Sequence, residues 1–459
     1  MRASRDYLFA GQTTSLCETC AALVPAKILI AGNDVLYRKR CPEHGVHTAL
    51  VSTDAAYWRL CQSFIKPGDL PLAFHSKVER GCPWDCGLCP DHEQHSCLAL
   101  IEVTERCDLR CPVCFAASGP DSGRDRTLAE IEAMLDAVVA AEGTPDLVQI
   151  SGGEPTRHPQ ILDILRAAKA RPIRHVMLNT NGLRLAHDPG FVAELAALTP
   201  GFEVYLQFDS LTRAGLERLR GADLRAVHER ALAHLDAHNL STTLVCTVEK
   251  GCNDCEIGAL IRHALSHRCV RGVTFQPVQA AGRVEGFDPT RRMVLSEIRR
   301  AIIDQSDGLF GDDDMLPLPC NPGAIAIGYA LRHGEGATAV TGMLPRELLL
   351  QAPNTITFES HPEFRAKLLQ LLSLSCSGEP MARLLGELLC CLPKIEVPAG
   401  LSYDRVFRVA VVSFLDRFNF CLGEVKRSCI HVATPEGALI PLDTYNLFHR
   451  PGLPGRRAP

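Results

Sequence analysis

The sequence predicts an α/β protein whose centre is a partial (β/α)6 barrel of the TIM type. From residue 98 onward, short apolar runs typical of buried strands alternate with amphipathic runs typical of helices. Strands separated by helices pair in parallel through right-handed crossovers, and six such units are too few to close an eight-stranded barrel. A cysteine-rich, metal-binding region is expected before this barrel, and a helical and irregular extension after it.

The strands and helices of the barrel can be placed in order. Strands are expected at 98–104, 146–151, 175–180, 202–208, 242–248 and 272–278. Helices are expected at 127–142, 161–170, 191–198 and 224–238. Parallel α/β sheets carry their chemistry at the carboxyl ends of the strands, so functional side chains are expected directly after the strand runs.

Composition limits the partners and the compartment. The 459-residue chain is 46% hydrophobic and carries a formal net charge of −5, so it has no general attraction for nucleic-acid phosphates and we expect no nucleic-acid partner. No stretch approaches the roughly 18 apolar residues that a transmembrane helix needs, and the first residues lack the apolar run of a signal peptide. We expect a cytoplasmic protein with no transmembrane segment, and peripheral association with a membrane stays open.

Cysteine is unusually frequent: the chain has 21, of which eleven fall within the first 114 residues in tight groups. Groups two to four residues apart suit metal ions or clusters better than a disulfide framework. The isolated Cys246, Cys269, Cys390 and Cys391 are interpreted instead as small buried apolar residues.

Three of these cysteines directly follow the first barrel strand. Cys107, Cys111 and Cys114 have the spacing C-x3-C-x2-C. Three thiolates can ligate three corners of a [4Fe-4S] cluster, and the loop is too short to supply a fourth ligand. One iron is therefore left open to another molecule.

Polar and glycine-rich segments end the next three strands. The second strand ends in SGGEP (151–155), in which glycines let the backbone approach a ligand and Glu154 can accept a hydrogen bond from an amino group. The third ends in NTNG (179–182) and the fourth in QFD (207–209). All three segments are expected at the same barrel mouth as the cysteines.

The cysteine motif, the aromatic Phe115 behind it and SGGEP one strand later resemble the radical S-adenosylmethionine (SAM) superfamily. The resemblance implies that the open iron chelates SAM, and that the reduced cluster cleaves it to a 5′-deoxyadenosyl radical, which abstracts hydrogen from an unactivated C–H bond. An external electron donor, such as a ferredoxin or flavodoxin, is implied as well. The cofactor-binding residues expected on this basis are Phe115, Gly152, Gly153, Glu154, Asn181 and Gln207; no catalytic residue is identified.

A first metal module is expected before the barrel. Cys17-x2-Cys20 and Cys41-Pro-Glu-His44 resemble a ribbon in which two knuckles hold one metal ion. Three cysteines and one histidine suit zinc, whereas iron would prefer a fourth thiolate, for which Cys61 is a candidate. Zinc and iron both stay open.

A second cysteine group repeats the C-x3-C-x2-C spacing at Cys82, Cys86 and Cys89, with no barrel strand before it. We interpret it as an auxiliary [4Fe-4S] cluster, with a second zinc module as the alternative. Its fourth ligand stays open among Cys97, Cys429 and an exogenous group.

These assignments divide the chain into five regions. They are a ribbon-like mononuclear metal module at 1–60, an auxiliary iron–sulfur segment at 61–97, the radical SAM partial barrel at 98–285, a C-terminal extension at 286–446 and a disordered tail at 447–459. Within the extension, the pattern predicts a helix after about residue 285, an irregular stretch at 316–329 and helices at 361–374 and 380–391.

Segments spread over most of the chain narrow the resemblance to one branch of the superfamily. They include GCPWDCGLCPDH (81–92), FQPVQAAGR (275–283) and VKRSCIHVATPEGALIPLDTYN (425–446). This branch contains the archaeal tetraether lipid synthases and 7,8-dihydro-6-hydroxymethylpterin dimethyltransferase-like proteins. The branch pattern has further cysteines where this chain has Ser428 and Asp443, so a C-terminal auxiliary cluster is expected to be degraded or absent.

The main functional prediction is a transferase or C–C bond-forming radical SAM enzyme that couples lipid chains as in tetraether synthesis. The alternatives are radical C-methylation of a pterin or other small heterocycle and, in another class, a non-catalytic iron–sulfur electron carrier. A lipid enzyme should contain a long apolar tunnel, for which 366–375 and 382–392 are candidate walls, and a pterin enzyme a small polar pocket.

Overall fold

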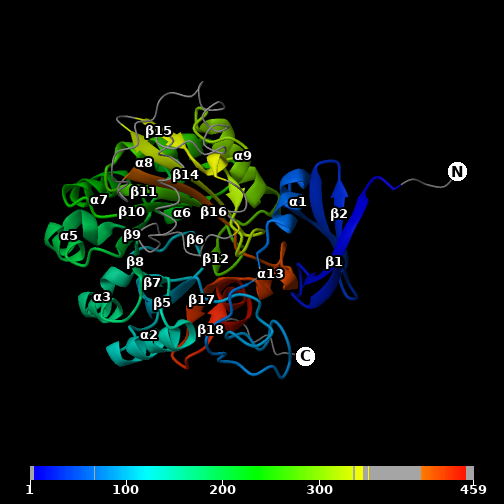
Figure 1. Ribbon diagram of the computed structural model, residues 1–459, viewed down its shortest axis with the longest axis horizontal. Helices are drawn as coiled ribbons and strands as arrows, with labels where there is room; N and C mark the ends of the chain where they lie inside the picture. Colours follow the sequence, from blue (N-terminus) through cyan, green and yellow to red (C-terminus); the bar gives the residue numbers. More distant parts are fainter. Residues whose placement is uncertain (1–4, 67, 334–335, 345–349, 351–404, 451–459) are drawn as a thin grey trace, which may run out of the picture.

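A computed structural model describes residues 5–66, 68–333, 336–344, 350 and 405–450. Six parallel strands, each flanked by helices, form the predicted partial barrel (Figure 1). In sheet order they are β5 (Leu98–Thr104), β7 (Leu147–Gly152), β8 (His175–Thr180), β9 (Phe202–Gln207), β10 (Thr242–Val248) and β11 (Val270–Pro277). The predicted fold class and all six strands are confirmed.

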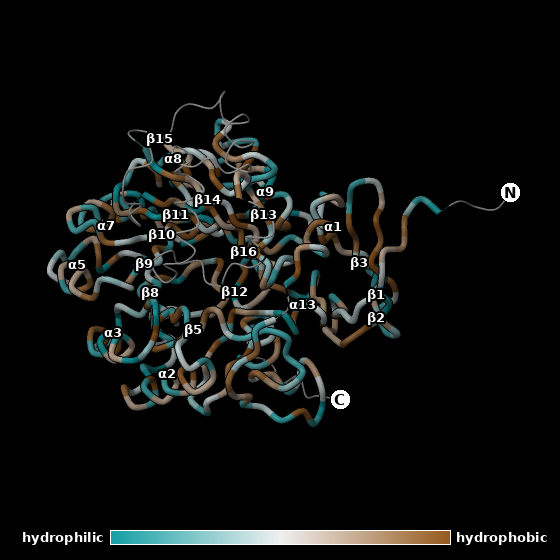
Figure 2. The backbone as a smooth tube through the Cα atoms, in the orientation of Figure 1, coloured by the Kyte–Doolittle hydropathy of each residue, from teal (hydrophilic) through white to brown (hydrophobic). Residues whose placement is uncertain are grey.

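The barrel strands are buried along almost their whole length because helices cover one face of the sheet and the barrel interior lies against the other. In β10, for example, six of the seven residues are buried. In Figure 2 hydrophobic segments lie in these central strands and also in the surrounding helices and the N-terminal strands. Cys246 and Cys269 are fully buried in the same core, as predicted for isolated cysteines; Cys390 and Cys391 lie outside the described residues.

Four helices form where the amphipathic pattern predicts them: α2 (Leu128–Glu142), α3 (Ile161–Lys169), α5 (Pro189–Ala196) and α7 (Arg225–Ala237). A capping box between Thr127 and Glu130 fixes the start of α2. Three more barrel helices were not predicted, namely α4 (Leu183–His187), α6 (Arg213–Arg220) and α8 (Ile257–Ser266). The helix expected after residue 285 is α9 (Leu295–Gln305).

The C-terminal extension adds strands to both edges of the barrel sheet. Beside β11, β16 (Val406–Val412) pairs in parallel, and β14 (Ile325–His333) then pairs antiparallel with β16. Beside β5, β17 (Ile430–Ala433) pairs in parallel and is followed by β18 (Leu439–Pro441). The prediction of an irregular stretch at 316–329 is wrong in part, because β13 (Leu316–Pro317) and the first half of β14 lie there. The helices predicted at 361–374 and 380–391 fall outside the described residues.

The N-terminal region is a separate antiparallel ribbon beside the barrel (Figure 1). Its strands are β1 (Leu8–Leu16), β2 (Leu23–Ala31), β3 (Asp34–Cys41) and β4 (Gly45–Ser52). The helix α1 (Ala55–Ser63) connects the ribbon to the described part of 64–97, which contains neither helix nor strand.

The chain's last described residues are ordered against the barrel. A helical turn, Tyr445–His449, buries Leu447, and Arg450 donates hydrogen bonds to Glu102 of β5 at 2.8 and 3.1 Å. The predicted start of a disordered tail at 447 is therefore wrong for 447–450, and 451–459 lie outside the described residues.

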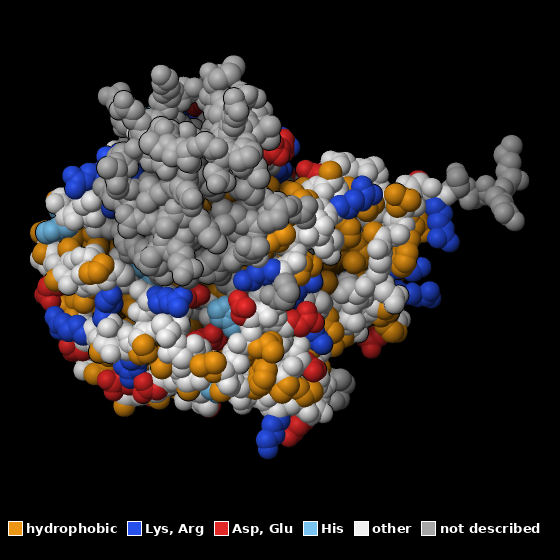
Figure 3. Space-filling model, viewed as in Figure 1, with side chains coloured by type: hydrophobic (Ala, Val, Ile, Leu, Met, Phe, Trp, Pro, Cys, Tyr) orange, Lys and Arg blue, Asp and Glu red, His pale blue; other side chains and the backbone are white. Residues whose placement is uncertain are grey.

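The described surface bears on membrane and nucleic-acid partners. Among the described helices, none is long and apolar enough to cross a membrane. On the face drawn in Figure 3, Lys and Arg side chains are interspersed with Asp and Glu side chains. The absence of a nucleic-acid partner stays a prediction.

A buried ion pair crosses the barrel interior from β16 to β9. Arg408 donates a hydrogen bond to Glu203 Oε1 at 2.5 Å and to Thr243 Oγ1 at 2.8 Å, and the Glu203 side chain is fully buried. Although burial opposes ionisation, the Arg408 guanidinium holds the pKa of Glu203 at about 2. The late strand β16 is thus fastened to the middle of the barrel.

Replacing Arg408 should therefore destabilise the whole domain. In Arg408→Met the Glu203 carboxylate is left buried without its cation, and we expect the free energy of unfolding to fall by about 3–5 kcal/mol. The matched control is Arg166→Met, which removes a pair of half-exposed ion pairs with Asp163 and Glu194 and should cost at most about 1 kcal/mol. Urea unfolding midpoints measure both; equal losses would contradict the role of the buried pair.

Candidate functional site

The three motif cysteines lie on the loop that leaves the carboxyl end of β5. The Cys107 amide donates to the Gly119 carbonyl at 3.1 Å, which closes this loop. Its middle forms the short strand β6 (Val113–Cys114), which pairs antiparallel with β12 (Arg283–Val284). The loop is thus held by backbone pairing on both sides.

The SGGEP loop packs directly on the backbone of the cysteine loop. The amides of Gly153 and Glu154 donate to the carbonyls of Thr104 and Arg106, both at 2.7 Å. A Cβ atom at position 153 would lie 2.2 Å from the Arg106 oxygen, and Gly152 has φ +126°. Both glycines are therefore required for the contact between the two loops. Their predicted close approach to a ligand stays a prediction.

Glu154 is buried at this junction. Its Oε1 atom accepts from Thr180 Oγ1 at 2.7 Å and from the Thr156 hydroxyl at 2.7 Å, and its Oε2 atom accepts from the Asn181 amide at 2.7 Å. Burial raises the pKa of the Glu154 carboxyl. The side chain fastens the ends of β7 and β8 together, and its predicted contact with an amino group of SAM stays a prediction.

Asn181 connects this junction to the cysteine loop. Its side-chain amide donates to Asp108 Oδ1 at 2.6 Å, and its oxygen accepts from the Leu183 amide at 3.0 Å. Asn181 therefore lies against the residue that follows Cys107. Its predicted role in cofactor binding is not tested by this contact.

Burial governs the chemistry of the motif thiols. It raises the pKa of Cys107 to about 12, with further contributions from Glu154, Asp108 and Cys111. It also raises the pKa of Cys111, which the nearby Arg220 opposes. Thiolates in this place need a strong counter-charge, and iron ligation supplies one. The donor set of three thiols close enough to influence one another fits a [4Fe-4S] cluster with one open iron.

Arg220 is fixed beside Cys111 by the end of β9. It forms an ion pair with Asp209, and its Nη2 atom donates to Gln207 Oε1 at 2.8 Å. Gln207 in turn donates to Asn179 Oδ1 at 2.8 Å. Gln207 therefore lies between the charged network at the cysteine loop and the barrel interior.

Arg283 is a site residue that the sequence analysis missed. Its guanidinium donates to the carbonyls of Cys111 at 2.7 Å, Ala117 at 3.2 Å and Ser118 at 2.7 Å. The preceding Gly282 has φ +64°, and a Cβ there would lie 2.2 Å from the Phe115 oxygen. In the sequence, the Gly-Arg pair of AAGR (280–283) was the only sign of this role. The sequence could not show which carbonyls Arg283 contacts.

A cavity fills the barrel interior between Phe115 and the amino ends of the strands. One wall is polar and consists of Gln149, Asn179, Tyr205, Gln207, Thr274, Gln276 and Arg408. The opposite wall is apolar and includes Leu98, Leu100, Leu318, Ile325, Ile327, Val412 and Ile430. Two predicted cofactor residues, Phe115 and Gln207, therefore border this cavity.

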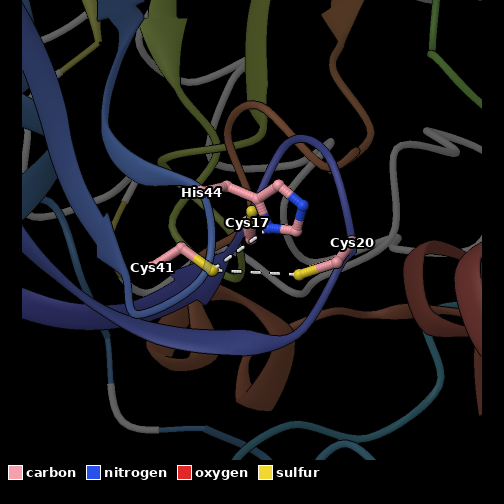
Figure 4. Close-up of side chains that lie close together, drawn as sticks. All are labelled: Cys17, Cys20, Cys41 and His44. Carbon is pink, nitrogen blue, oxygen red and sulfur yellow. Dashed lines mark hydrogen bonds between the residues drawn. The ribbon is translucent and has the colours of Figure 1, made fainter.

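The N-terminal ribbon gathers its four predicted ligands into one group (Figure 4). Cys20 Sγ lies 3.9 Å from Cys41 Sγ, and Cys41 Sγ lies 3.5 Å from His44 Nδ1. Although burial opposes it, the backbone N–H groups of Cys20 and Thr19 lower the pKa of the Cys17 thiol to about 7. These four residues fit a mononuclear metal ion, and the structure places Cys61 elsewhere, in the core beside Tyr57, which excludes it as the fourth donor.

Cys82, Cys86 and Cys89 line a common small pocket together with Asp91 and His92. They therefore lie close enough to share a cluster. Of the fourth ligands proposed from the sequence, Cys97 and Cys429 do not line it; they lie together with Cys320. Cys97 and Cys429 are therefore not the fourth ligand of this group. They lie side by side because each directly precedes one of the paired parallel strands β5 and β17.

The parallel barrel, its cysteine loop and the SGGEP loop define the class of this protein: it contains a radical SAM domain. Residues 101–264 match the family model described as the Radical SAM superfamily, and residues 9–53 match the one described as the HMPTM N-terminal zinc ribbon domain.

Two relatives extend this result. The chain is 28% identical to 7,8-dihydro-6-hydroxymethylpterin dimethyltransferase of Methanocaldococcus jannaschii, over 96% of this chain and 94% of the relative. It is 29% identical to GTP 3′,8-cyclase of Chlorobaculum tepidum, over 50% of this chain and 69% of that protein. Among solved structures, Streptococcus suis SuiB bound to precursor peptide SuiA aligns with TM-score 0.40 and 18% identity; the alignment covers 47% of each chain, about half of that protein.

Removing the Arg283 clamp should loosen the cysteine loop and lower its iron content. We expect Arg283→Ala to lose at least half of the iron of the radical SAM cluster on gel filtration. Arg283→Lys should lose less, because its ammonium can still donate to one of the carbonyls, although it cannot reach all three at once. The matched control is the exposed Arg291→Ala, whose guanidinium also donates to a backbone carbonyl, that of the half-buried Lys250. Iron and sulfide analysis measures the effect; equal iron in Arg283→Ala and Arg291→Ala would contradict it.

Disrupting the ribbon group should release a single metal ion. We expect Cys41→Ser to lose about one ion per chain, because a tetrahedral site with three ligands binds much more weakly. His47→Ala is the control, since His47 lies on β4 next to the ribbon site but outside the ligand group. Elemental analysis of the two variants checks this, and retention of the ion in Cys41→Ser would refute the site.

Proposed function

We propose that this protein is a radical SAM enzyme that modifies a carbon atom of a pterin or similar flat heterocycle held in the barrel cavity. When bound at Cys107, Cys111 and Cys114, the cluster and SAM supply a radical able to remove a hydrogen atom from an unactivated C–H bond. An external donor such as a ferredoxin or flavodoxin would provide the electron. The printed activity of the Methanocaldococcus jannaschii relative, a pterin dimethyltransferase, supports this choice.

The observation that carries the proposal is the polar wall of the cavity. Gln149 is buried and lines the cavity, and its side-chain amide forms no hydrogen bond within the described part of the chain, whereas its backbone pairs within the sheet. Gln276 Nε2 reaches Tyr205 only at 3.4 Å, a long bond. A heterocycle with ring nitrogens and a carbonyl would satisfy these amides, whereas a saturated chain would leave them buried without partners, at about 1–3 kcal/mol for each group.

The remaining residues of this site hold the cysteine loop in place and orient the substrate. Phe115 and the apolar wall exclude water from one face of a flat substrate, and the amides of Gln149 and Gln276 fix its edge. Arg220 and Asp209 keep the Cys111 side of the loop in place. The cavity argues against a non-catalytic electron carrier, because a protein that only transfers electrons does not need a substrate cavity.

The metal sites before the barrel belong to the same proposal. We assign zinc to Cys17, Cys20, Cys41 and His44, since the Cys3His donor set suits zinc and residues 9–53 match a zinc ribbon. We assign an auxiliary [4Fe-4S] cluster to Cys82, Cys86 and Cys89.

Coupling of lipid chains is the second candidate, and the apolar wall of the cavity favours it. Leu98, Leu100, Ile325 and Ile327 would accept an aliphatic chain without desolvation cost. The candidate tunnel walls at 366–375 and 382–392 lie outside the described residues.

One experiment separates the two candidates. The anaerobically reconstituted enzyme, with dithionite and SAM, is given either 7,8-dihydro-6-hydroxymethylpterin or membrane lipid, and 5′-deoxyadenosine and the methylated or coupled product are measured. We expect pterin to stimulate turnover, and Gln149→Leu to raise its KM by about tenfold, since a lost hydrogen bond in a buried site costs about 1–2 kcal/mol. Stimulation by lipid alone, with Gln149→Leu as active as the wild type, would establish the second candidate instead.

The radical chemistry itself has its own control. A variant with Cys107, Cys111 and Cys114 all changed to Ala should form no 5′-deoxyadenosine with any substrate. Continued SAM cleavage by that variant would overturn the assignment of the cluster, whatever the substrate is.

A further inference from the structure

Three cysteines from distant parts of the chain meet outside both predicted cluster motifs. The sulfur atoms of Cys97, Cys320 and Cys429 all lie within 4.8 Å of one another. The residues are only 7%, 2% and 2% exposed, and Cys320 Sγ is 3.7 Å from Cys429 Sγ. None of the three is in a disulfide. They form a buried thiol group, which is called the seam group below.

The spacing of the seam group fits one tetrahedral ion. Zinc–sulfur bonds of about 2.3 Å put two sulfur ligands of one ion about 3.8 Å apart, close to the 3.7 Å between Cys320 and Cys429. The ribbon site provides a reference within the same chain, because its Cys20 and Cys41 sulfurs are 3.9 Å apart. In a [4Fe-4S] cluster each cysteine binds a different iron, so the sulfurs stand farther apart than on a single ion.

His95 is the candidate for a fourth donor. Its Nε2 atom lies 3.5 Å from Cys97 Sγ, the separation of about 3.5 Å that zinc–nitrogen and zinc–sulfur bonds of ordinary length produce in a tetrahedron. The imidazole is more than 4.8 Å from at least one of the other two sulfurs, so binding of an ion would draw it inward.

Glu142 supports His95 as it would support a metal ligand. The opposite ring atom, Nδ1, is 2.7 Å from Glu142 Oε2. Histidines that bind metals ordinarily donate their second N–H to a carboxylate or carbonyl in this manner. Glu142 is itself fixed, because its other oxygen accepts from the Ser96 amide at 2.9 Å.

The position of the seam group suggests what an ion would do there. Cys97 directly precedes β5 and Cys429 directly precedes β17, which pairs with β5 at one edge of the sheet. Cys320 lies between β13 and β14, at the opposite edge. Ile325 and Ile430 pack around the group. The seam group is therefore where the two edges of the open barrel come together.

We propose that Cys97, Cys320, Cys429 and His95 bind one tetrahedral divalent metal ion, zinc by its donor set, which fastens the two edges of the partial barrel. The three thiols release their protons to solvent when the ion binds. The imidazole binds in its neutral form and keeps its proton on Nδ1, which donates a hydrogen bond to Glu142. Cys97 and Cys429 also line the barrel cavity, so the ion closes its base while the SAM-binding loop closes the carboxyl end.

The test uses the full-length chain in a Cys41→Ala background, in which the ribbon ion is absent. We expect about one zinc per chain to remain, and to disappear in Cys429→Ser while iron and labile sulfide stay unchanged. The control is Cys246→Ser, which alters a fully buried cysteine on β10 away from the group. Loss of about four irons and their sulfide in Cys429→Ser would show that the seam group binds a cluster and not a single ion. Unchanged metal content would show that the seam group is only part of the apolar packing. Either result overturns the proposal.

A milder variant keeps the test decisive if Cys429→Ser does not fold. Glu142→Gln removes the carboxylate charge and leaves one side-chain oxygen to accept from either His95 or the Ser96 amide, and we expect it to weaken binding of the ion about 10–100-fold. Zinc release to a chromogenic chelator and the thiolate-to-metal absorption of the cobalt-loaded protein measure this. Identical zinc release from Glu142→Gln and from the parent protein would refute the role of His95 and with it the proposed site.

Discussion

The architecture of the site depends on the contact between two backbones, those of the cysteine loop and the SGGEP loop. Two amide–carbonyl bonds of 2.7 Å join them, from Gly153 to Thr104 and from Glu154 to Arg106. The 2.2 Å that a Cβ at position 153 would leave to the Arg106 oxygen shows that no side chain fits between them. Since β5 and β7 are adjacent parallel strands, their carboxyl ends bring the two loops together, and the positions of the thiols depend on this contact.

The incomplete barrel imposes a second constraint, because an open parallel sheet leaves two edges with unpaired backbone groups. The chain covers both edges with strands from its own C-terminal half: β16 and β14 on one side, β17 and β18 on the other. Arg408 of β16 then reaches Glu203 across the interior. The late strands therefore complete the same domain that holds the cofactor site, and their sequence is under the same structural demands.

Sequence predicted what is local and periodic. The six barrel strands and the spacing of Cys107, Cys111 and Cys114 follow from patterns of a few residues, and the structure confirms the strands. The strand β14 was missed because the prolines and glycines before it obscure a short apolar run. Arg283 and the seam group could not be found in this way, since the atoms that they contact are more than one hundred residues distant along the chain.

The C-terminal turn shows why such distant contacts matter for the end of the cavity beside the cysteine loop. Arg450 lies over the rings of Phe115 and Tyr445, at 5.5 and 4.7 Å from their centres, and forms its ion pair with Glu102. Cation–ring contacts of this kind are strongest where water is excluded. Phe115, the residue that separates the cysteine loop from the cavity, is therefore held by the end of the chain as well as by its own loop, and the rigidity of the site is a property of the whole fold.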